Sequence, residues 1–397
     1  MELIKPRKDL NYIPVNYHKR VYVYIQDRLG LVKENLMIPG EVYNFLVHLD
    51  RCDSLAQLQE VLVRENRGII ISKDEIIKTI NELDKLWLLD SENYKKKKQQ
   101  IVEEFTSKKV RPYVFADKSY PSDPDNLEKF IKECLEGKIK VLAPIKAIFA
   151  PHFEISLAKD IYGKTYGVLW GNSYDRVVVL GVGHGLEDGL FSITDKDFDT
   201  PLGLVKNDRF AFQKLKAAGK GVVAKTDFDH KNEHSIEFQL IFLKYLLKKF
   251  SLIPILCGSL LYFLKDYSRE EFLSVAGGFI EVLRDIVTDP NKRTLVVAGV
   301  DFSHIGPKFG HEEDVYSLKS VACEHDKILI DALLNRDIEG FWDESKRVKD
   351  KYNVCGFSAL ALLMEIVNYK RGEVVGYRMN IEEPTRSGVG FAGGILY

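Results

Sequence analysis

The sequence predicts an α/β protein whose layered central sheet is flanked by helices, with a small α+β domain in front of it. Three observations support this prediction. Beyond residue 140, short runs rich in β-branched residues alternate with longer stretches whose apolar residues recur at helical spacing. The N-terminal part instead shows a strand-like run and three helical patterns. Seven of the nine histidines follow residue 150, and several of them come directly after predicted strands.

Composition places the chain among ordinary folded proteins. Its 397 residues leave room for two or three domains, at about 150 residues each. With 45% hydrophobic and 29% charged residues the balance is a usual one. The 57 basic and 58 acidic residues give a net charge of -1. Because no global basic field exists to attract a phosphate backbone, we expect no binding to nucleic acid.

Cysteine use and hydropathy indicate a cytoplasmic protein. The five cysteines are scattered and form no C-x-x-C pair, which is typical of a reducing compartment. The N-terminus has no apolar signal core. The longest apolar runs, such as 358–367, are about half the length that crosses a bilayer. We therefore expect neither export nor insertion into a membrane.

Residues 1–92 are predicted to form a winged-helix-like domain that opens and closes with strand-like segments. The run 20–25 is mostly β-branched and aromatic, and a turn candidate follows it. Residues 31–32 are therefore expected to pair back with it in a short hairpin. The segment 87–89 closes the domain, and helical patterns occupy the sequence between these segments.

Three helices are expected in this domain. Apolar spacing predicts the first over 40–49 and the second over 55–62. Ser72 and Glu75 form a capping box that opens the third. Acidic and basic residues are mixed along the third helix, which argues against a surface that faces phosphates. A role in docking a protein or peptide, or as a structural cap, is therefore favoured over DNA binding.

Residues 93–140 are expected to form a helical linker, and residues 141–397 the α/β domain. The lysines at 95–98 are interpreted as a solvated helix end or linker rather than a binding patch. A helix is predicted over 126–137. The predicted strands of the α/β domain cover 145–150, 176–180, 252–256, 294–299 and 373–377. Its predicted helices cover 207–218, 235–250, 269–286, 318–334 and 357–370.

Three histidines, His152, His184 and His304, lie just after predicted strands. Because the carboxyl ends of strands in an open α/β sheet converge on one crevice, their side chains are expected to meet there. Alone, His152 is more typical of a histidine that is satisfied by local hydrogen bonds. The glycines at 181 and 183 either let the backbone approach a ligand or serve simple turn geometry.

Further residues are candidates for chemistry at this crevice. Asp301 shares a loop with His304, and it either orients that imidazole or caps a helix. His234 and Glu237 lie three apart on one helical face, a spacing that suits a ligand or acid–base pair and also plain surface hydrogen bonds. Cys355 precedes an apolar helix, whose N-terminus is expected to lower the thiol pKa and favour a metal-binding thiolate. A lone cysteine there is more typical of a small buried side chain.

An ordered series of motifs runs through residues 145–397. The two most specific are Glu-His-Ser-Ile-Glu at 233–237 and Asp-Phe-Ser-His at 301–304. The others are Ala150-Pro-His152, Leu180-Gly-Val-Gly-His184, Asp199-Thr-Pro-Leu202, Ile253-Pro-Ile255, Glu324-His-Asp326 and Cys355-Gly356. Together they resemble the MEMO family, which includes the AmmeMemoRadiSam system protein B group.

The resemblance implies a fold similar to that of class III extradiol dioxygenases. Those enzymes hold iron between two histidines and a carboxylate and leave positions open for dioxygen and substrate. By motif, the implied ligands are His152, His184 and Cys355, with the cysteine in place of the carboxylate. A His-His-Cys set implies one transition-metal ion, with iron or copper as the leading candidates and zinc as a further one.

The resemblance also implies the residues that move protons. His304 is the implied acid–base residue, and Asp301 and His234 are implied to support it. The chain departs from the family pattern beside the first ligand, where Phe153-Glu154 follows His152, and after the second, where Gly185 replaces a histidine often found in relatives. These changes concern substrate contacts. Glu154 is a candidate for one more carboxylate at the site.

The leading expectation is a cytoplasmic metal-binding redox enzyme that acts on a small or peptide-borne substrate. The alternative is a non-catalytic scaffold that holds a peptide in the same crevice. A metal-free hydrolase is disfavoured because the chain has no Gly-x-Ser-x-Gly motif. The N-terminal part resembles small winged-helix peptide-docking domains found near radical-SAM maturation enzymes. The association of the family group with AMMECR1-like and radical-SAM proteins makes such proteins the expected partners.

Overall fold

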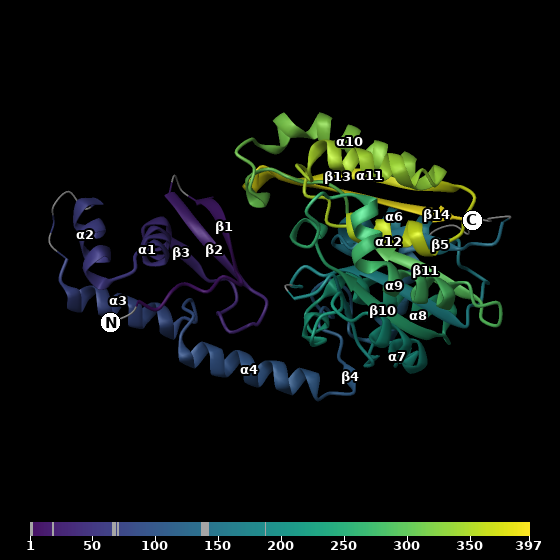
Figure 1. Cartoon of the computed structure of the whole chain (residues 1–397), viewed down its shortest axis with the longest axis horizontal. Coiled ribbons are helices and arrows are strands. Elements are labelled where there is room, and N and C mark those ends of the chain that lie inside the picture. Colours follow the sequence, from purple (N-terminus) through teal and green to yellow (C-terminus); the bar gives the residue numbers. More distant parts are fainter. Residues whose placement is uncertain (1–2, 18–19, 66–68, 70, 136–142, 187) are drawn as a thin grey trace. The chain divides into compact units, whose positions relative to one another are not determined.

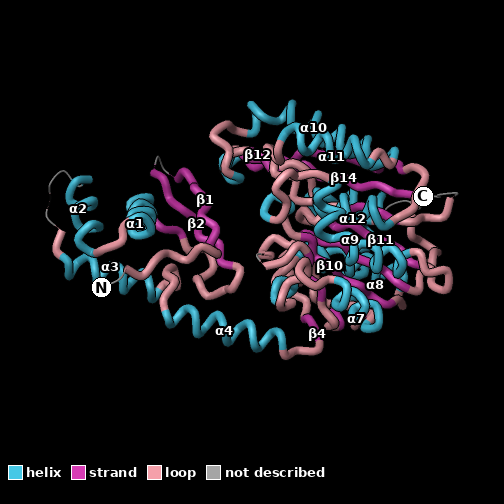
Figure 2. The backbone as a smooth tube through the Cα atoms, in the orientation of Figure 1, coloured by secondary structure: helices cyan, strands magenta, loops and turns pink. Residues whose placement is uncertain are grey.

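The computed structural model describes residues 3–17, 20–65, 69, 71–135, 143–186 and 188–397. Its contacts divide the chain into two compact units, residues 1–107 with 383–385 and residues 108–382 with 386–397. Helices and strands occur in both units (Figures 1 and 2). This division rests on contacts alone, and the domain boundaries expected at residues 92 and 140 stay predictions.

The first unit opens with an antiparallel sheet of order β1-β2-β3. The central strand β2 (Arg20–Asp27) pairs with β1 (Leu10–Tyr17) on one edge and with β3 (Met37–Pro39) on the other. The hairpin predicted with residues 31–32 is therefore wrong. The Asp27 carboxylate instead accepts the backbone N–H groups of those two residues, which ties them into a loop.

Helices follow in this unit close to where the sequence predicts them, as α1 (Gly40–Arg51), α2 (Leu55–Glu65) and α3 (Lys73–Lys85). The capping box of α3 is confirmed. The Ser72 hydroxyl accepts the Glu75 N–H, and the Glu75 carboxylate accepts the Ser72 N–H at 2.8 Å. Buried apolar side chains of the three helices and the sheet form one core. The winged-helix likeness stays a prediction.

A buried arginine joins the start of the chain to the next helix, α4 (Glu92–Thr106). Arg7 is 1% exposed and donates hydrogen bonds to the carboxylates of Asp9 and Asp27. Its guanidinium lies 4.2 Å from the centroid of the Tyr94 ring, which is a cation–π contact. The Tyr94 hydroxyl in turn donates to Asp9 at 2.7 Å. The run of four lysines lies within this helix.

The larger unit is built on one mixed sheet, whose main path has the order β12-β14-β5-β11-β6-β10-β7. Its centre is parallel and consists of β5 (Ala147–Ala150), β11 (Thr294–Gly299), β6 (Arg176–Val182) and β10 (Ser251–Cys257). The sequence predicts all four strands to within a few residues. Because they run parallel, their carboxyl ends lie along one edge of the sheet.

One side of this centre is extended by the C-terminal hairpin of β13 (Gly372–Glu382) and β14 (Ser387–Leu396), and β14 pairs with β5. β14 is not predicted from the sequence, because four glycines interrupt its apolar pattern. At least one of them is required by packing. A Cβ atom on Gly393 would lie 2.0 Å from the Thr165 hydroxyl oxygen.

Short strands complete the sheets of this unit. β12 (His304–Ile305) pairs with β14, and β7 (Phe191–Ile193) runs antiparallel to β10. β9 (Lys206–Asn207) lies parallel to the start of β10. A separate pair is formed by β4 (Val110–Arg111) and β8 (Asp197–Phe198).

Helices cover both faces of the larger sheet (Figure 1). One face carries α5 (Pro124–Cys134), α6 (Ile155–Gly167) and α8 (His234–Leu247). The core on the other face receives side chains from α7 (Arg209–Ala218), α9 (Arg269–Val287), α10 (Val315–Asn335), α11 (Ile338–Val348) and α12 (Phe357–Ile366). Two of these helices, α6 and α11, are not predicted from the sequence. The layered α/β arrangement that it predicts is confirmed.

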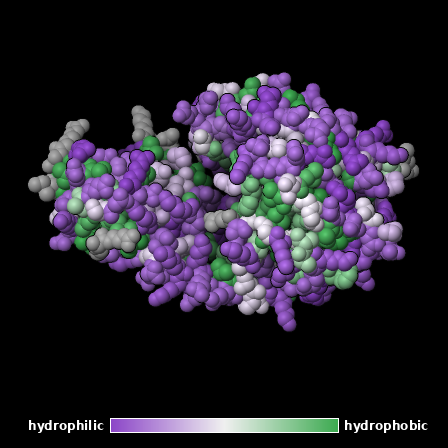
Figure 3. Space-filling model, in the orientation of Figure 1, coloured by the Kyte–Doolittle hydropathy of each residue, from purple (hydrophilic) through white to green (hydrophobic). Residues whose placement is uncertain are grey.

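No helix in the part of the chain that the structure describes combines the length and apolarity needed to cross a membrane. One of the longest apolar runs of the sequence, 358–367, is buried in the core around α12. Figure 3 shows hydrophilic side chains over most of the visible face, with hydrophobic side chains gathered in smaller areas.

A buried carboxylate of α10 fixes the loop that follows β11. Asp326 accepts hydrogen bonds from the N–H and hydroxyl groups of Ser303 and from the hydroxyl of Tyr377. Burial raises the pKa of Asp326 to about 6. The helix therefore anchors Ser303, which directly precedes His304.

Replacement of Arg7 by leucine should destabilise the first unit strongly, because the carboxylates of Asp9 and Asp27 lose their buried partner. Breaking such a pair costs about 3–5 kcal/mol. Lys8→Leu is the matched control, since the ion pair that Lys8 forms with Asp50 is exposed, of a kind that contributes about 1 kcal/mol at most. Hydrogen exchange of the β2 amides in the full chain measures both effects, and equal protection in the two variants would contradict this role of Arg7.

Asp326→Asn should change how stability depends on pH. Between about pH 4 and pH 6 the folded protein holds the Asp326 proton more tightly than the unfolded chain, so wild-type stability falls as the pH rises through that window. The rise from 3.8 to about 6 corresponds to about 3 kcal/mol.

Asparagine keeps an acceptor for Ser303 and has no proton to lose, so the variant should not show this fall. Urea unfolding at pH 4 and pH 7 measures the difference. Parallel pH profiles for the variant and the wild type would show that burial does not raise the pKa of Asp326.

Candidate metal centre

Three of the predicted site residues lie at the carboxyl edge of the parallel strands. His152, His184 and Asp301 each stand two residues beyond the end of β5, β6 and β11, respectively. These strands are neighbours in the order β5-β11-β6. The three side chains therefore come to one place although the sequence separates them widely. His304 follows in β12, on the same loop as Asp301.

Two strand glycines let the N-terminus of α8 reach the same edge. A Cβ atom on Gly181 of β6 would lie 2.5 Å from Ser235 Oγ, and one on Gly299 of β11 would lie 2.3 Å from the Ser235 backbone oxygen. Neither distance is tolerable for a real side chain, so α8 packs this closely only because both residues are glycine. The Ser235 hydroxyl accepts the Val182 N–H and donates to the Val182 carbonyl oxygen. These two hydrogen bonds place His234 beside the histidines at the strand edge. Gly181 thus serves helix packing, a role that the sequence analysis does not foresee.

His152 is 3% exposed and is held from two sides. Its Nδ1–H donates to the carbonyl oxygen of Gly299 at 3.0 Å, and its backbone N–H donates to the Asp301 carboxylate at 3.1 Å. Since a carbonyl oxygen can only accept, the proton is on Nδ1 and Nε2 keeps its lone pair. Nε2 lies 3.6 Å from Cys355 Sγ and 3.5 Å from an Asp301 carboxylate oxygen.

His184 is oriented by a buried carboxylate. Its Nδ1 lies 2.9 Å from an oxygen of Glu233. Burial raises the pKa of Glu233, but the facing rings of His184 and His234 and the hydrogen bonds to the carboxylate outweigh this and hold that pKa well below its ordinary value. Glu233 is therefore an acceptor, which puts the His184 proton on Nδ1 and leaves the lone pair on Nε2. The His184 side chain is 26% exposed.

Cys355 comes to this edge from the opposite face of the sheet, just before α12. The Gly356 N–H donates to the Asp301 backbone oxygen at 3.1 Å, and the Cys355 thiol faces the same oxygen at 3.6 Å. These contacts anchor the cysteine to the loop after β11. Ligand atoms of His152, His184 and Cys355 all lie within 4.8 Å of one another. The three predicted ligands therefore form a group that could hold a metal ion.

The donor set fits a transition metal. Neutral imidazole nitrogens and a thiolate sulfur are ligand types that zinc, copper and iron accept in proteins. The Nδ1 atoms of His152 and His184 are both engaged with oxygen acceptors. This is the arrangement that orients histidines whose other nitrogen binds a metal.

The thiol pKa of Cys355 is raised rather than lowered, contrary to the prediction from the sequence. The start of α12 was expected to lower it, but burial raises it well above its ordinary value, and the nearby Asp301 carboxylate acts in the same direction. Loss of solvation outweighs the helix dipole here, because the half-buried sulfur packs against protein groups on the side of His152 and Asp301. A thiolate at this position therefore depends on a neighbouring cation, as in metal sites where the ion itself stabilises the deprotonated ligand.

Three histidines of the site, His152, His234 and His304, are uncharged at neutral pH. Burial lowers the pKa of His152 and of His234 to about 3. It lowers the pKa of His304 to about 4, although Asp301 acts in the opposite direction. A neutral imidazole has a lone pair to give to a metal or a proton. The cluster is thus prepared to bind a cation rather than to repel one.

His304 and Asp301 lie close to this group, with partners other than those that the sequence suggests. The His304 Nδ1–H donates to the Phe302 carbonyl oxygen at 2.8 Å. Asp301 accepts the backbone N–H groups of residues 152–153, and among the described residues no hydrogen bond joins it to His304. The helix cap predicted as an alternative role of Asp301 is wrong, because the strand β12 follows it.

His234 completes a cluster of three imidazoles. Its ring stacks on that of His184, with centroids 5.2 Å apart and an interplanar angle of 11°, and it meets His152 edge to face at 5.1 Å. The Phe115 ring contacts it edge-on at 5.6 Å. His184, Glu233 and His234 form a second set whose ligand atoms lie within 4.8 Å of one another. Glu233 lies in the motif at 233–237, but the sequence alone indicates no role for it.

Glu237 has a structural role in place of the pairing with His234 that its spacing suggests. It is buried, forms an ion pair with Arg111 and accepts the backbone N–H of Phe115. Arg111 also donates to the backbone oxygen of Glu233 at 2.8 Å. The segment around β4 therefore fixes the start of α8. No local pattern signals this contact, because 126 positions separate the two charged residues.

Two of the residues that depart from the family pattern, Phe153 and Glu154, have side-chain partners outside the metal group. Glu154, the candidate for a further carboxylate, accepts the Ser119 hydroxyl at 2.8 Å and the N–H of Ser156 at the start of α6. Phe153 stacks on Phe391 with ring centroids 4.8 Å apart. Glu154 is therefore a helix cap.

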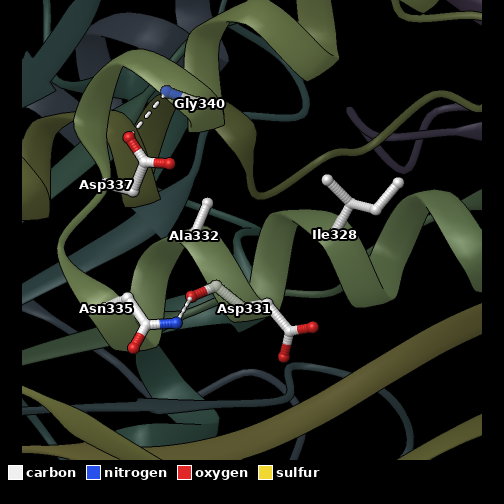
Figure 4. Close-up of a pocket in the computed structure, with 6 residues that line it drawn as sticks. All are labelled: Ile328, Asp331, Ala332, Asn335, Asp337 and Gly340. Carbon is white, nitrogen blue, oxygen red and sulfur yellow. Dashed lines mark hydrogen bonds between the residues drawn. The ribbon is translucent and has the colours of Figure 1, made fainter.

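A hollow of about 270 Å³ between α10 and α11 is separate from this centre (Figure 4). Its polar groups are engaged locally, since the Asp337 carboxylate accepts the Gly340 N–H and the Asn335 amide donates to the Asp331 backbone oxygen. None of the predicted site residues lines it.

Comparison with known proteins extends the likeness beyond the site. A family model described as Memo-like protein matches residues 111–395. The chain is 30% identical to a MEMO1 family protein of Aquifex aeolicus, over 94% of this chain and 95% of that protein. It is 29% identical to one of Methanosarcina barkeri, over 67% and 95%, and 25% identical to one of Thermus thermophilus, over 85% and 97%.

The family model and the Aquifex protein match different lengths of the chain. The family model covers the larger unit almost entirely. The Aquifex match spans nearly the whole chain and therefore extends into the first unit as well. With its motif series, its layered sheet and these matches, the chain belongs to the family of Memo-like proteins.

Proposed function

We propose that this chain is a metal-dependent redox protein in which His152, His184 and Cys355 hold one transition-metal ion, iron or copper in preference to zinc. The observation that carries the proposal is their convergence. Three ligand atoms from three distant segments lie within 4.8 Å of one another. When bound, such an ion supplies a Lewis-acidic and redox-active centre.

His304 is the proposed acid–base residue. Because its Nδ1–H is fixed by the Phe302 carbonyl, Nε2 is the nitrogen that exchanges a proton with the substrate. The lowered pKa of His304, about 4, makes the ring a proton acceptor at neutral pH. Asp301 and His234 are proposed to support it, Asp301 through its charge and His234 by closing the imidazole cluster.

The substrate is proposed to reach the group from its exposed side. His152 is buried, whereas the His184 and His234 side chains are 26% and 31% exposed. A small molecule or a side chain of a peptide has access to these two rings without displacing the core. This supports a small or peptide-borne substrate.

The proposal includes partners and location. The five cysteines are free, which suits the cytoplasm. AMMECR1-like and radical-SAM proteins are the proposed protein partners. The mixed charges of α3 support a protein or peptide rather than a nucleic acid as the target of the first unit.

Cys355→Ala should lower metal content at least tenfold, because it removes one of three ligands. Cys257→Ala is the matched control, since Cys257 is equally a free thiol but is buried in β10 and belongs to no candidate ligand group among the described residues. Elemental analysis of anaerobically purified full-length protein measures both. Equal metal content in the two variants would contradict the ligand assignment, and wild-type protein that binds no iron, copper or zinc would favour the peptide-holding scaffold.

His304→Asn should leave metal content unchanged, because His304 is not in the ligand group. The same elemental analysis tests this, run beside His184→Asn, which should lose the metal. If His304→Asn loses as much metal as His184→Asn, His304 is a ligand and the proposed division between ligands and acid–base residue is wrong.

A further inference from the structure

One carboxylate faces two imidazoles at the metal group. Glu233 is the N-cap residue of α8 and is 6% exposed. One of its oxygens lies 2.9 Å from His184 Nδ1. The other lies 3.3 Å from His234 Nδ1 and accepts the Ser235 N–H at 2.9 Å. Both carboxylate oxygens are thus occupied by donors.

The position of Glu233 is fixed from outside the site. Its backbone oxygen accepts a hydrogen bond from the buried Arg111 guanidinium, which is itself paired with Glu237. Ser235, two residues further along the chain, is held against β6 by its hydroxyl. The carboxylate therefore meets the two rings as a rigid group, as an orienting residue requires.

Resting on the metal site proposed above, we propose that Glu233 is a positioning residue of that site and not a ligand. It keeps the His184 proton on Nδ1, so that Nε2 is free for the metal, and it holds His234 stacked on His184. Carboxylates that orient a metal-ligating histidine in this way typically change metal affinity by about 10–100-fold.

A different reading makes Glu233 a ligand of a second ion, together with His184 and His234. The hydrogen bonds disfavour it, because each Glu233 oxygen already accepts an N–H group. His184 would also have to give up both ring protons to serve two ions. This reading predicts two equivalents of bound metal, whereas the positioning role predicts one.

Glu233→Gln is the decisive variant. A glutamine offers one acceptor oxygen where the carboxylate offers two, so it satisfies either the His184 ring or the Ser235 N–H but not both. Its NH₂ group then faces a donor. We expect the Nδ1–H tautomer of His184 to lose its dominance in this variant, with part of the population protonated on Nε2 and unable to bind.

The fold supplies a matched control in a second buried carboxylate–imidazole pair. His325 Nδ1 lies 2.7 Å from a carboxylate oxygen of Glu344, and both residues are buried between α10 and α11. Neither belongs to a set of candidate ligands among the described residues. Glu344→Gln should therefore disturb His325 and the ion pair of Glu344 with Arg347, and it should leave His184 unchanged.

The first measurement needs no metal. Long-range ¹H–¹⁵N spectra of the metal-free full chain, labelled with ¹⁵N-histidine, report which ring nitrogen carries the proton. The proposal predicts that His184 in the wild type is protonated on Nδ1, and that Glu233→Gln changes this signal whereas Glu344→Gln does not. A wild-type His184 protonated mainly on Nε2 would overturn the proposal even if the glutamine variant failed to fold.

The second measurement is a titration with Zn²⁺ alone, in competition with a chelator. We expect one equivalent in the wild type, an affinity lowered about 10–100-fold in Glu233→Gln, and no change in Glu344→Gln. Unchanged affinity in Glu233→Gln, or a second equivalent that this variant loses, would overturn the positioning role. A wild type that binds no Zn²⁺ would count against the proposed metal site, while the tautomer measurement still decides the action of Glu233 on His184.

Discussion

The close approach of α8 to the sheet is the constraint on which the candidate centre depends. Gly181 and Gly299, in neighbouring strands, remove the two Cβ atoms that would collide with Ser235. The helix therefore begins directly at the carboxyl edge of the strands, where Glu233 meets His184. A larger residue at either glycine would lift the helix and separate the carboxylate from the imidazole that it orients.

The electrostatics of the centre follow from the same burial. Burial raises the pKa of Asp301 to about 6 and that of Cys355 well above its ordinary value, and it lowers the pKa of His152. Without a cation, the Cys355 thiol keeps its proton and the His152 imidazole stays neutral. A metal ion supplies the missing positive charge, so binding is expected to release the Cys355 proton.

The sequence foretells the features of this site that depend on strand ends. His152, His184 and Asp301 follow buried strands, and parallel pairing brings them together. The sequence does not predict contacts that depend on packing between distant segments, such as the Arg111–Glu237 ion pair that fixes α8. β14 is not predicted for a related reason. Its glycines are needed for close packing, and they interrupt the apolar pattern that would indicate a strand. The thiol pKa was misjudged because the depth of burial cannot be read from a helix start.

The central claim is that two imidazoles and one thiolate bind the same ion. X-ray absorption spectroscopy of the full chain loaded with one equivalent of Zn²⁺ tests it most directly. The account predicts one sulfur scatterer at about 2.3 Å together with imidazole nitrogens at about 2.0–2.1 Å. A spectrum with nitrogen and oxygen scatterers alone would contradict it, because Cys355 would then lie outside the coordination sphere.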